Sequence, residues 1–144
     1  MDVQITDYNF ATFLYDNFIF LDMIVIYITC KDDKEAIKIS KALLKKRLIA
    51  CANLFPIKSV YRWHGRIKEE NEVMLIVKTK DHMYDEIKDD VEKMHSYDVP
   101  CIEAIKVADI NKSYLKWLFE ETSKPVSLGK YLKNVPKEKT KKKK

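Results

Sequence analysis

The sequence predicts an α+β fold in which strands and helices follow the order βαββαβ, with one further helix after them. Three observations support this order. Residues 23–29 form an uninterrupted apolar run, residues 50–79 alternate like the two arms of one long β-hairpin, and segments of helical periodicity flank that hairpin on both sides. The arrangement corresponds to a ferredoxin-like sandwich with an added C-terminal helix.

The first strand and the first helix are predicted from residues 23–48. The run Met-Ile-Val-Ile-Tyr-Ile-Thr at residues 23–29 is typical of a strand buried on both faces, so we expect it at the centre of the sheet. Asp32 or Asp33 can then cap a helix. Apolar residues recur at helical spacing after this cap: Ala36, Ile39 and Leu43. With lysines between them, they predict an amphipathic helix.

A long hairpin occupies the middle of the chain. Residues 59–63 and 72–79 alternate between two sets of side chains, and the polar residues 68–71 between them suit a four-residue loop. Pro56 lies inside the first arm, so that arm either bends there or runs along an edge of the sheet. Gly65 predicts a bulge or a close approach of two backbones. Because both faces carry apolar side chains, we expect another copy of the chain to cover this hairpin.

The second half of the chain completes the fold. Asp81 can cap a second helix, whose apolar residues recur at helical spacing. These residues are Met83, Ile87, Val91 and Met94. Pro100 imposes an extended backbone, and residues 101–107 then alternate as a fourth strand. Asn111 or Ser113 can cap a final short helix.

Charge divides the 144 residues into three parts. Residues 1–22 contain four aspartates and no lysine or arginine, whereas residues 123–144 contain nine lysines and one glutamate. Most of the formal charge of +5 therefore comes from the tail. We expect a domain at residues 23–122, a basic and largely disordered tail, and an N-terminal extension for which Met23 offers an alternative start.

Composition predicts a cytoplasmic protein. Three cysteines are an odd number, which favours reduced thiols over a set of disulfides. The N-terminus lacks the positively charged segment of a signal peptide, and no apolar run is long enough for a transmembrane helix. We therefore expect no contact with membranes.

Five motifs follow one another along the chain. They are Ala50-Cys51-Ala52-Asn53, then Pro56-x-x-Ser59-x-Tyr61-x-Trp63-x-Gly65-x-Ile67, Glu72-x-x-Leu75-x-x-Lys78-Thr79, His95-x-Tyr97-Asp98-Val99-Pro100, and Tyr114-Leu115-x-Trp117. This ordered set resembles the CutA family of divalent-cation tolerance proteins, over about residues 23–122. The resemblance implies a homotrimer that binds divalent metal ions, copper(II) above all, and that acts in metal tolerance.

We expect His95, Cys30 and Cys101 to be the metal ligands, because imidazoles and thiolates are the donors that soft or borderline metals choose. Relatives with two adjacent histidines have the first where this chain has Met94, and relatives with a cysteine ending the first strand have it where this chain has Ile28. Cys30 can replace that cysteine from the same face of the strand, although its position suggests a loop. The family usually has Glu in place of Cys101, and the alternative role of this cysteine is that of a small apolar residue at the start of a strand.

A second set of polar and aromatic residues comes from the same motifs: Cys51, Tyr61, Trp63, Glu72, Lys78, Tyr97 and Trp117. We weigh two roles for this set. Its members either line a cleft between subunits that binds a small anion or metabolite, or pack a trimer interface that includes an ion pair.

Catalysis has no motif to support it. The chain has no arrangement of Ser, His and Asp that indicates a catalytic triad, and its two glycines are too few for a phosphate-binding loop. The pattern of an RNA-recognition motif is absent too, so only the lysine-rich tail offers non-specific contact with nucleic acid. We expect a non-catalytic protein that binds copper(II) in metal tolerance or homeostasis. The alternative is a PII-like regulatory module that binds a small metabolite at its subunit clefts.

Overall fold

The computed structural model describes residues 23–122. The predicted N-terminal extension and basic tail lie outside these residues. The elements are β1 (Met23–Cys30), α2 (Asp33–Lys45), β2 (Cys51–Trp63), β3 (Arg66–Lys80), a 3₁₀ turn η1 (Asp81–Met83), α3 (Tyr84–Met94), β4 (Ile102–Lys106) and α4 (Lys112–Thr122). The predicted order βαββαβ with one added helix is thereby confirmed.

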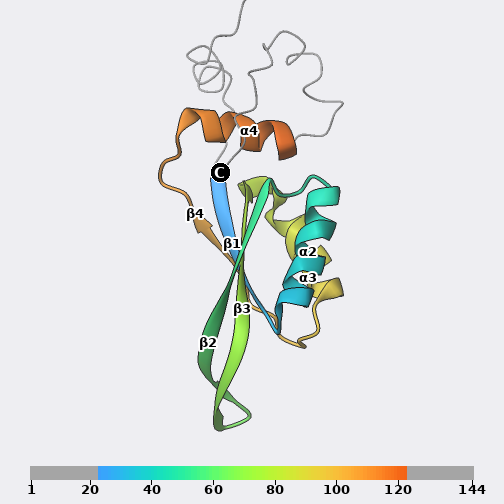
Figure 1. Ribbon diagram of the computed structural model, residues 1–144, viewed down its shortest axis with the longest axis vertical. Helices are drawn as coiled ribbons and strands as arrows, with labels where there is room; N and C mark the ends of the chain where they lie inside the picture. Colours follow the sequence, from blue (N-terminus) through green and yellow to red (C-terminus); the bar gives the residue numbers. More distant parts are fainter. Residues whose placement is uncertain (1–22, 123–144) are drawn as a thin grey trace, which may run out of the picture. The chain divides into compact units, whose positions relative to one another are not determined.

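The four strands form one antiparallel sheet in the order β2-β3-β1-β4. Helices α2 and α3 lie together on one side of this sheet (Figure 1). The core between them contains the inward side chains of β1 and β3 and the apolar stripes of the two helices. Its largest fully buried members are Ile26, Ile28, Ile39, Leu43, Leu75 and Ile87. The periodic apolar residues of the sequence therefore form the contact between helices and sheet.

Strand β1 is central, as predicted, but it is fully buried on one face only. Ile24, Ile26 and Ile28 face the helices and are at most 4% exposed. Val25 and Tyr27 point to the opposite face and are only partly buried. The prediction of burial on both faces was wrong for the single chain, because no described element covers the second face completely.

The starts of the two helices differ. The Asp32 side chain accepts a hydrogen bond of 2.8 Å from the Glu35 backbone N–H and caps α2. No side chain caps α3, so the prediction that Asp81 caps this helix was wrong. Asp81 instead begins the 3₁₀ turn η1, from which α3 continues at Tyr84.

The hairpin turn lies four residues earlier than the sequence predicts. Strands β2 and β3 stay in one register from the pair Cys51 and Lys78 to the pair Trp63 and Arg66, which leaves a two-residue turn. His64 and Gly65 form this turn with φ angles of 47° and 75°, as a type I′ turn requires. The predicted loop at residues 68–71 was wrong, and so was the bulge or close backbone approach predicted at Gly65. These polar residues belong to β3, where both faces are exposed.

The outer half of the hairpin projects beyond the sheet (Figure 1). Strand β1 pairs with β3 from Val73 to Lys80, so within the described residues 23–122 the segments 57–63 and 66–72 pair only with each other. Pro56 lies just before this ribbon on β2, an edge strand whose outer side needs no donor. An isolated two-stranded ribbon is only marginally stable in water. We therefore expect contact with another molecule to stabilise the ribbon.

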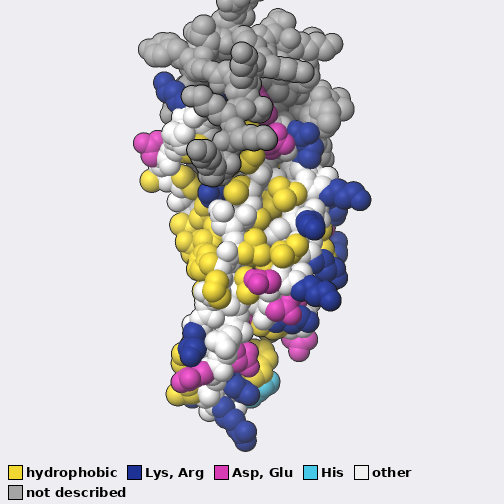
Figure 2. Space-filling view, in the orientation of Figure 1, with side chains coloured by type: hydrophobic (Ala, Val, Ile, Leu, Met, Phe, Trp, Pro, Cys, Tyr) yellow, Lys and Arg dark blue, Asp and Glu magenta, His cyan; other side chains and the backbone are white. Residues whose placement is uncertain are grey.

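The face of the sheet opposite α2 and α3 is apolar and partly open. Phe55 and Ile105 are 44% and 45% exposed, and Met74 and Ile76 on the same face of β3 are half-buried. Figure 2 shows hydrophobic side chains gathered over the middle of the molecule, whereas lysine and arginine side chains follow the helical side. A continuous exposed apolar surface of this kind commonly marks a contact with another molecule.

Replacing Gly65 by alanine tests the position of the turn. A Cβ added at Gly65 meets no atom within 4 Å, so the substitution acts through the backbone alone. Because φ is 75°, we expect a loss of about 1 kcal/mol in unfolding free energy, measured by urea denaturation at fixed protein concentration. His64→Asn is the matched control, and it should stabilise the turn slightly because asparagine tolerates positive φ. A neutral or stabilising Gly65→Ala would instead indicate a glycine inside a strand.

Candidate functional site

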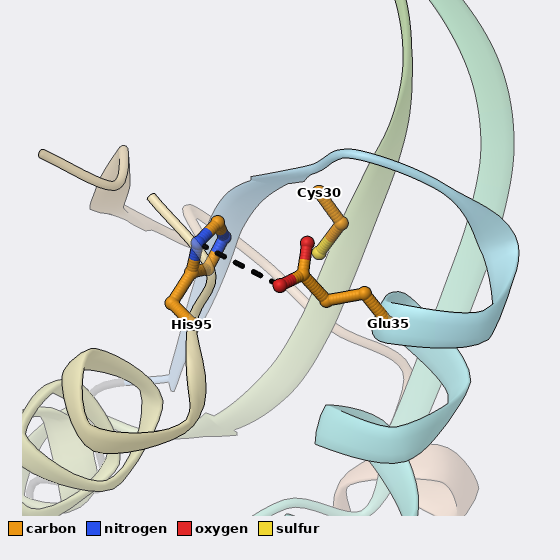
Figure 3. A group of neighbouring side chains, drawn as sticks. All are labelled: Cys30, Glu35 and His95. Atoms are coloured by element: carbon orange, nitrogen blue, oxygen red, sulfur yellow. Dashed lines mark ion pairs between the residues drawn. The ribbon is translucent and has the colours of Figure 1, made fainter. Parts of the chain in front are cut away.

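Three side chains with metal-binding chemistry meet at one end of the sheet: Cys30, Glu35 and His95 (Figure 3). Cys30 is the last residue of β1, Glu35 lies in the first turn of α2, and His95 directly follows α3. Their potential ligand atoms all lie within 4.8 Å of one another. The His95 side chain is 0% exposed and that of Glu35 is 7% exposed. The structure therefore brings together two of the three predicted metal ligands, and Cys30 belongs to the strand and not to a loop.

Hydrogen bonds define the state of the His95 ring. Its Nε2 lies 2.8 Å from the Thr29 carbonyl oxygen, which can only accept, so Nε2 carries the proton. Its Nδ1 accepts a 3.0 Å hydrogen bond from the Tyr97 backbone N–H. The ring is therefore neutral, and the lone pair on its Nδ1 already accepts the hydrogen bond from Tyr97. The 4.0 Å contact between Nδ1 and Glu35 Oε1, dashed in Figure 3, is too long for a hydrogen bond.

The Glu35 carboxylate links three segments of the chain. Its Oε2 accepts from the Lys31 backbone N–H at 3.0 Å, and its Oε1 accepts from the Ser96 backbone N–H at 2.8 Å. Burial alone would raise the pKa of Glu35, but the hydrogen bonds from Lys31 and Ser96 outweigh it and lower this pKa below its ordinary value. Glu35 is therefore a charged carboxylate that joins the start of α2 to the loop after α3.

The Cys30 thiol is protonated at neutral pH. Burial raises its pKa to about 12, and the negative charges of Glu35, Asp32 and Glu72 act in the same direction. The sulfur is therefore unreactive as a nucleophile in this state. As a donor set, one nitrogen, one oxygen and one sulfur suit a borderline or soft divalent ion. Such an ion has to replace the thiol proton and compete with the hydrogen bonds from Ser96 and Tyr97.

Five other predicted residues line a second site, a half-open pocket of about 730 Å³ between the projecting hairpin and the loop after α3. They are Tyr61, Trp63, Glu72, Tyr97 and Cys101. The Tyr97 hydroxyl donates a 2.7 Å hydrogen bond to Glu72 Oε1. Burial, followed by the interaction with Glu72, raises the pKa of Tyr97, so its hydroxyl stays protonated. Cys101 belongs to this pocket and lies outside the group formed by Cys30, Glu35 and His95.

The remaining predicted residues lie at the opposite end of β3. Cys51 is the register partner of Lys78, and the Lys78 ammonium lies 5.3 Å from the centroid of the Tyr114 ring. The Tyr114 ring in turn lies 5.2 Å from that of Trp117. Lys78 and Glu72 are six residues apart on one strand, or about 20 Å. They cannot form an ion pair within one chain.

Sequence reasoning missed Glu35, Glu70 and Asp98. Glu35 stands three residues after Asp32, and this spacing is the pattern of a capping box. That pattern places the carboxylate near the backbone N–H groups at the start of α2, where it accepts from Lys31, the residue before the cap, but it does not indicate the bond to Ser96, which lies 61 residues away. Glu70 and Asp98 both line the pocket, yet Glu70 carries no signal in the sequence, and Asp98 belongs to the fourth motif without having been expected to line a site.

Fold and site together define a ferredoxin-like α+β protein with a buried nitrogen, oxygen and sulfur donor cluster beside an acidic pocket. The family described as "CutA1 divalent ion tolerance protein" matches residues 24–121. The chain therefore belongs to this family. Within residues 23–122, no helix is both long and apolar enough to cross a membrane.

Individual relatives agree with this assignment. The divalent-cation tolerance protein CutA of Pyrococcus horikoshii is 49% identical over 102 residues, which are 71% of this chain and 100% of that protein. A crystal structure of CutA1 from the same organism has a TM-score of 0.68 at 48% identity, covering 70% of this chain and 99% of that one. The structure of a protein described as the periplasmic divalent cation tolerance protein CutA from Archaeoglobus fulgidus has a TM-score of 0.69 at 44% identity, with coverages of 70% and 99%.

The variant Glu35→Gln tests the role of this carboxylate. Glutamine has one acceptor oxygen, so either the Lys31 or the Ser96 N–H loses its partner. We expect a loss of about 1 to 3 kcal/mol in unfolding free energy at neutral pH. Because the folded pKa lies below the ordinary value of 4.5, the advantage of glutamate is complete above that value and is lost as pH falls through the folded pKa.

Urea denaturation at several pH values measures this difference. Glu86→Gln removes an exposed carboxylate from α3 and is the matched control, for which we expect almost no loss. If the difference in unfolding free energy between wild type and Glu35→Gln stayed the same at acid pH, the charged carboxylate would not be the source of the stabilisation.

Proposed function

We propose that this chain acts in divalent-cation tolerance by binding a divalent metal ion, copper(II) in particular, without catalysis. The observation that supports this proposal is the convergence of Cys30, Glu35 and His95 on one buried point. Family membership supplies the physiological setting. The three donor residues account for the preference for copper(II). Only one of them offers a carboxylate oxygen, whereas calcium and magnesium prefer sites made of oxygen ligands.

Each of the three residues has a defined role in this proposal. His95 offers Nδ1 while its Nε2–H stays bonded to the Thr29 carbonyl, which keeps the ring in one tautomer and orientation. Glu35 offers a charged oxygen, and Cys30 offers sulfur once its proton has left. When bound, the metal supplies a positive charge that these donors neutralise. Cys101 is a separate thiol, which we do not place in this group.

Copper(II) titration by calorimetry, with oxygen excluded, tests the ligand set. Cys30→Ser preserves the shape of the side chain and should weaken binding by at least about tenfold, or 1.4 kcal/mol. Cys101→Ser is the matched control and should keep wild-type affinity, because Cys101 lies outside the cluster. Equal affinity of wild type and Cys30→Ser would exclude the cluster. A loss confined to Cys101→Ser would move the metal site to the pocket.

We also propose that the chain assembles as a homotrimer. The support is the exposed ribbon of residues 57–63 and 66–72, together with the open apolar face of the sheet. Val60 and Ile67 lie on one face of the ribbon and are 63% and 69% exposed, while Trp63 lies on the other and is 41% exposed. Apolar surface on both faces of a two-stranded ribbon needs cover from outside the chain.

Sedimentation analysis tests the assembly. We expect wild-type protein to sediment as a trimer at micromolar concentration, and Trp63→Ala to dissociate, because the substitution removes a large apolar contact. Ile37→Ala is the matched control, since Ile37 is similarly exposed, at 44%, but lies on helix α2. A Trp63→Ala protein that stays trimeric would argue against contact through the ribbon.

A PII-like regulatory role is the alternative. The pocket beside the hairpin contains Glu70, Glu72 and Asp98 against one lysine, Lys68, so its charge disfavours the phosphates of a nucleotide. Calorimetric titration with adenine nucleotides separates the two functions, and we expect no binding. For location we propose the cytoplasm, where the three free cysteines stay reduced, whereas the Archaeoglobus fulgidus relative is described as periplasmic.

A further inference from the structure

We propose that the half-open pocket between the projecting hairpin and the loop after α3 binds an organic cation, with a primary alkylammonium group as its preferred chemistry. This site goes beyond the metal centre, because it uses other side chains and another kind of ligand. Its volume of about 730 Å³ lies within the range of pockets for small molecules. The side chains that give it this specificity are Tyr61, Trp63, Glu70, Glu72, Tyr97 and Asp98.

Glu72 is the central acceptor of this pocket. The residue is only 8% exposed, although its carboxylate faces a cavity. One oxygen accepts from the Tyr97 hydroxyl at 2.7 Å, and within residues 23–122 no hydrogen bond reaches the other oxygen. Within the same residues no lysine, arginine or histidine pairs with Glu72. A largely buried carboxylate without a cation is costly, and a ligand ammonium group would supply the missing charge.

The other charges of the pocket add to this preference. Glu70 and Asp98 also line it, and Lys68 is the only cationic residue in its lining. Glu70 is held in place by the Tyr61 hydroxyl, which donates a 2.9 Å hydrogen bond to its Oε2. The excess of negative charge attracts a cation and repels an anion. The small anion considered from the sequence is therefore disfavoured at this pocket.

Aromatic rings make the pocket suitable for an organic cation in particular. Tyr61, Trp63 and Tyr97 contribute to its lining, and in the single chain the first two are 37% and 41% exposed. The face of an aromatic ring attracts an ammonium group, while Val99 offers apolar contact to an alkyl chain. Because the free Glu72 oxygen accepts hydrogen bonds, a primary ammonium with three N–H donors fits better than a quaternary one.

Fluorescence of Trp63 reports directly on this pocket. The chain has two tryptophans, so the variant Trp117→Phe leaves Trp63 as the sole reporter. The assembled protein is titrated with n-butylammonium chloride, and in parallel with n-butanol as its uncharged analogue, at constant ionic strength. We expect a saturable change with the ammonium ion, and binding of butanol at least about tenfold weaker.

Two charge-matched variants show whether Glu72 is the acceptor. Glu72→Gln in the Trp117→Phe background should reduce affinity for n-butylammonium by about tenfold or more. Glu69→Gln removes the same charge three residues earlier on β3, from a side chain that points to the opposite face of the ribbon, and should reduce the affinity less than twofold. If Glu72→Gln does not assemble, Asp98→Asn in the pocket takes its place, with an expected loss of threefold or more against the Glu69→Gln control.

Several results would overturn the proposal. The first is an absence of saturable binding to the assembled wild-type pocket, as expected if another copy of the chain fills it. Equal affinity for n-butylammonium and n-butanol would identify a merely apolar cavity. Equal losses in Glu69→Gln and in the pocket variant would identify a long-range effect of net charge. Tighter binding of tetramethylammonium than of n-butylammonium would contradict the hydrogen bond to Glu72.

Discussion

The length of the β2–β3 hairpin is the constraint on which the rest of the structure depends. Its inner half pairs with β1 and forms the sheet, and its outer half pairs only with itself beyond Glu72. The two-residue turn at His64 and Gly65 keeps both arms in one register over this whole length. The same extension exposes apolar side chains and forms one wall of the pocket. The proposed assembly and the proposed ligand site therefore depend on the same part of the hairpin.

The loop after α3 connects the two candidate sites. The Tyr97 backbone N–H bonds to His95 Nδ1 in the donor cluster, whereas the Tyr97 hydroxyl bonds to Glu72 in the pocket. Ser96 similarly bonds to Glu35 through its backbone and lines the pocket. Hydrogen bonds thus hold this short segment on both sides. The donor cluster and the pocket therefore share this segment, although they are formed by different side chains.

Much of the fold could be predicted from the sequence, because its core residues recur with the periods of strands and helices. Ile39 and Leu43 on α2 are examples. The turn was misplaced because the polar residues 68–71 resemble a loop, whereas they belong to a strand with two exposed faces. Cys30 and His95 were predicted as ligands from their residue types and from the family resemblance. Glu35 could not be predicted with them, because its place depends on a contact with Ser96 across 61 residues.

Amide hydrogen exchange along the projecting hairpin tests the central claim most directly. In an isolated chain, the amides of residues 57–63 and 66–72 belong to a ribbon without cover and should exchange rapidly. If other copies cover the ribbon, these amides should be protected at micromolar concentration, and the protection should fall on dilution. Rapid exchange of the ribbon amides at concentrations where the core strands remain fully protected would contradict this account.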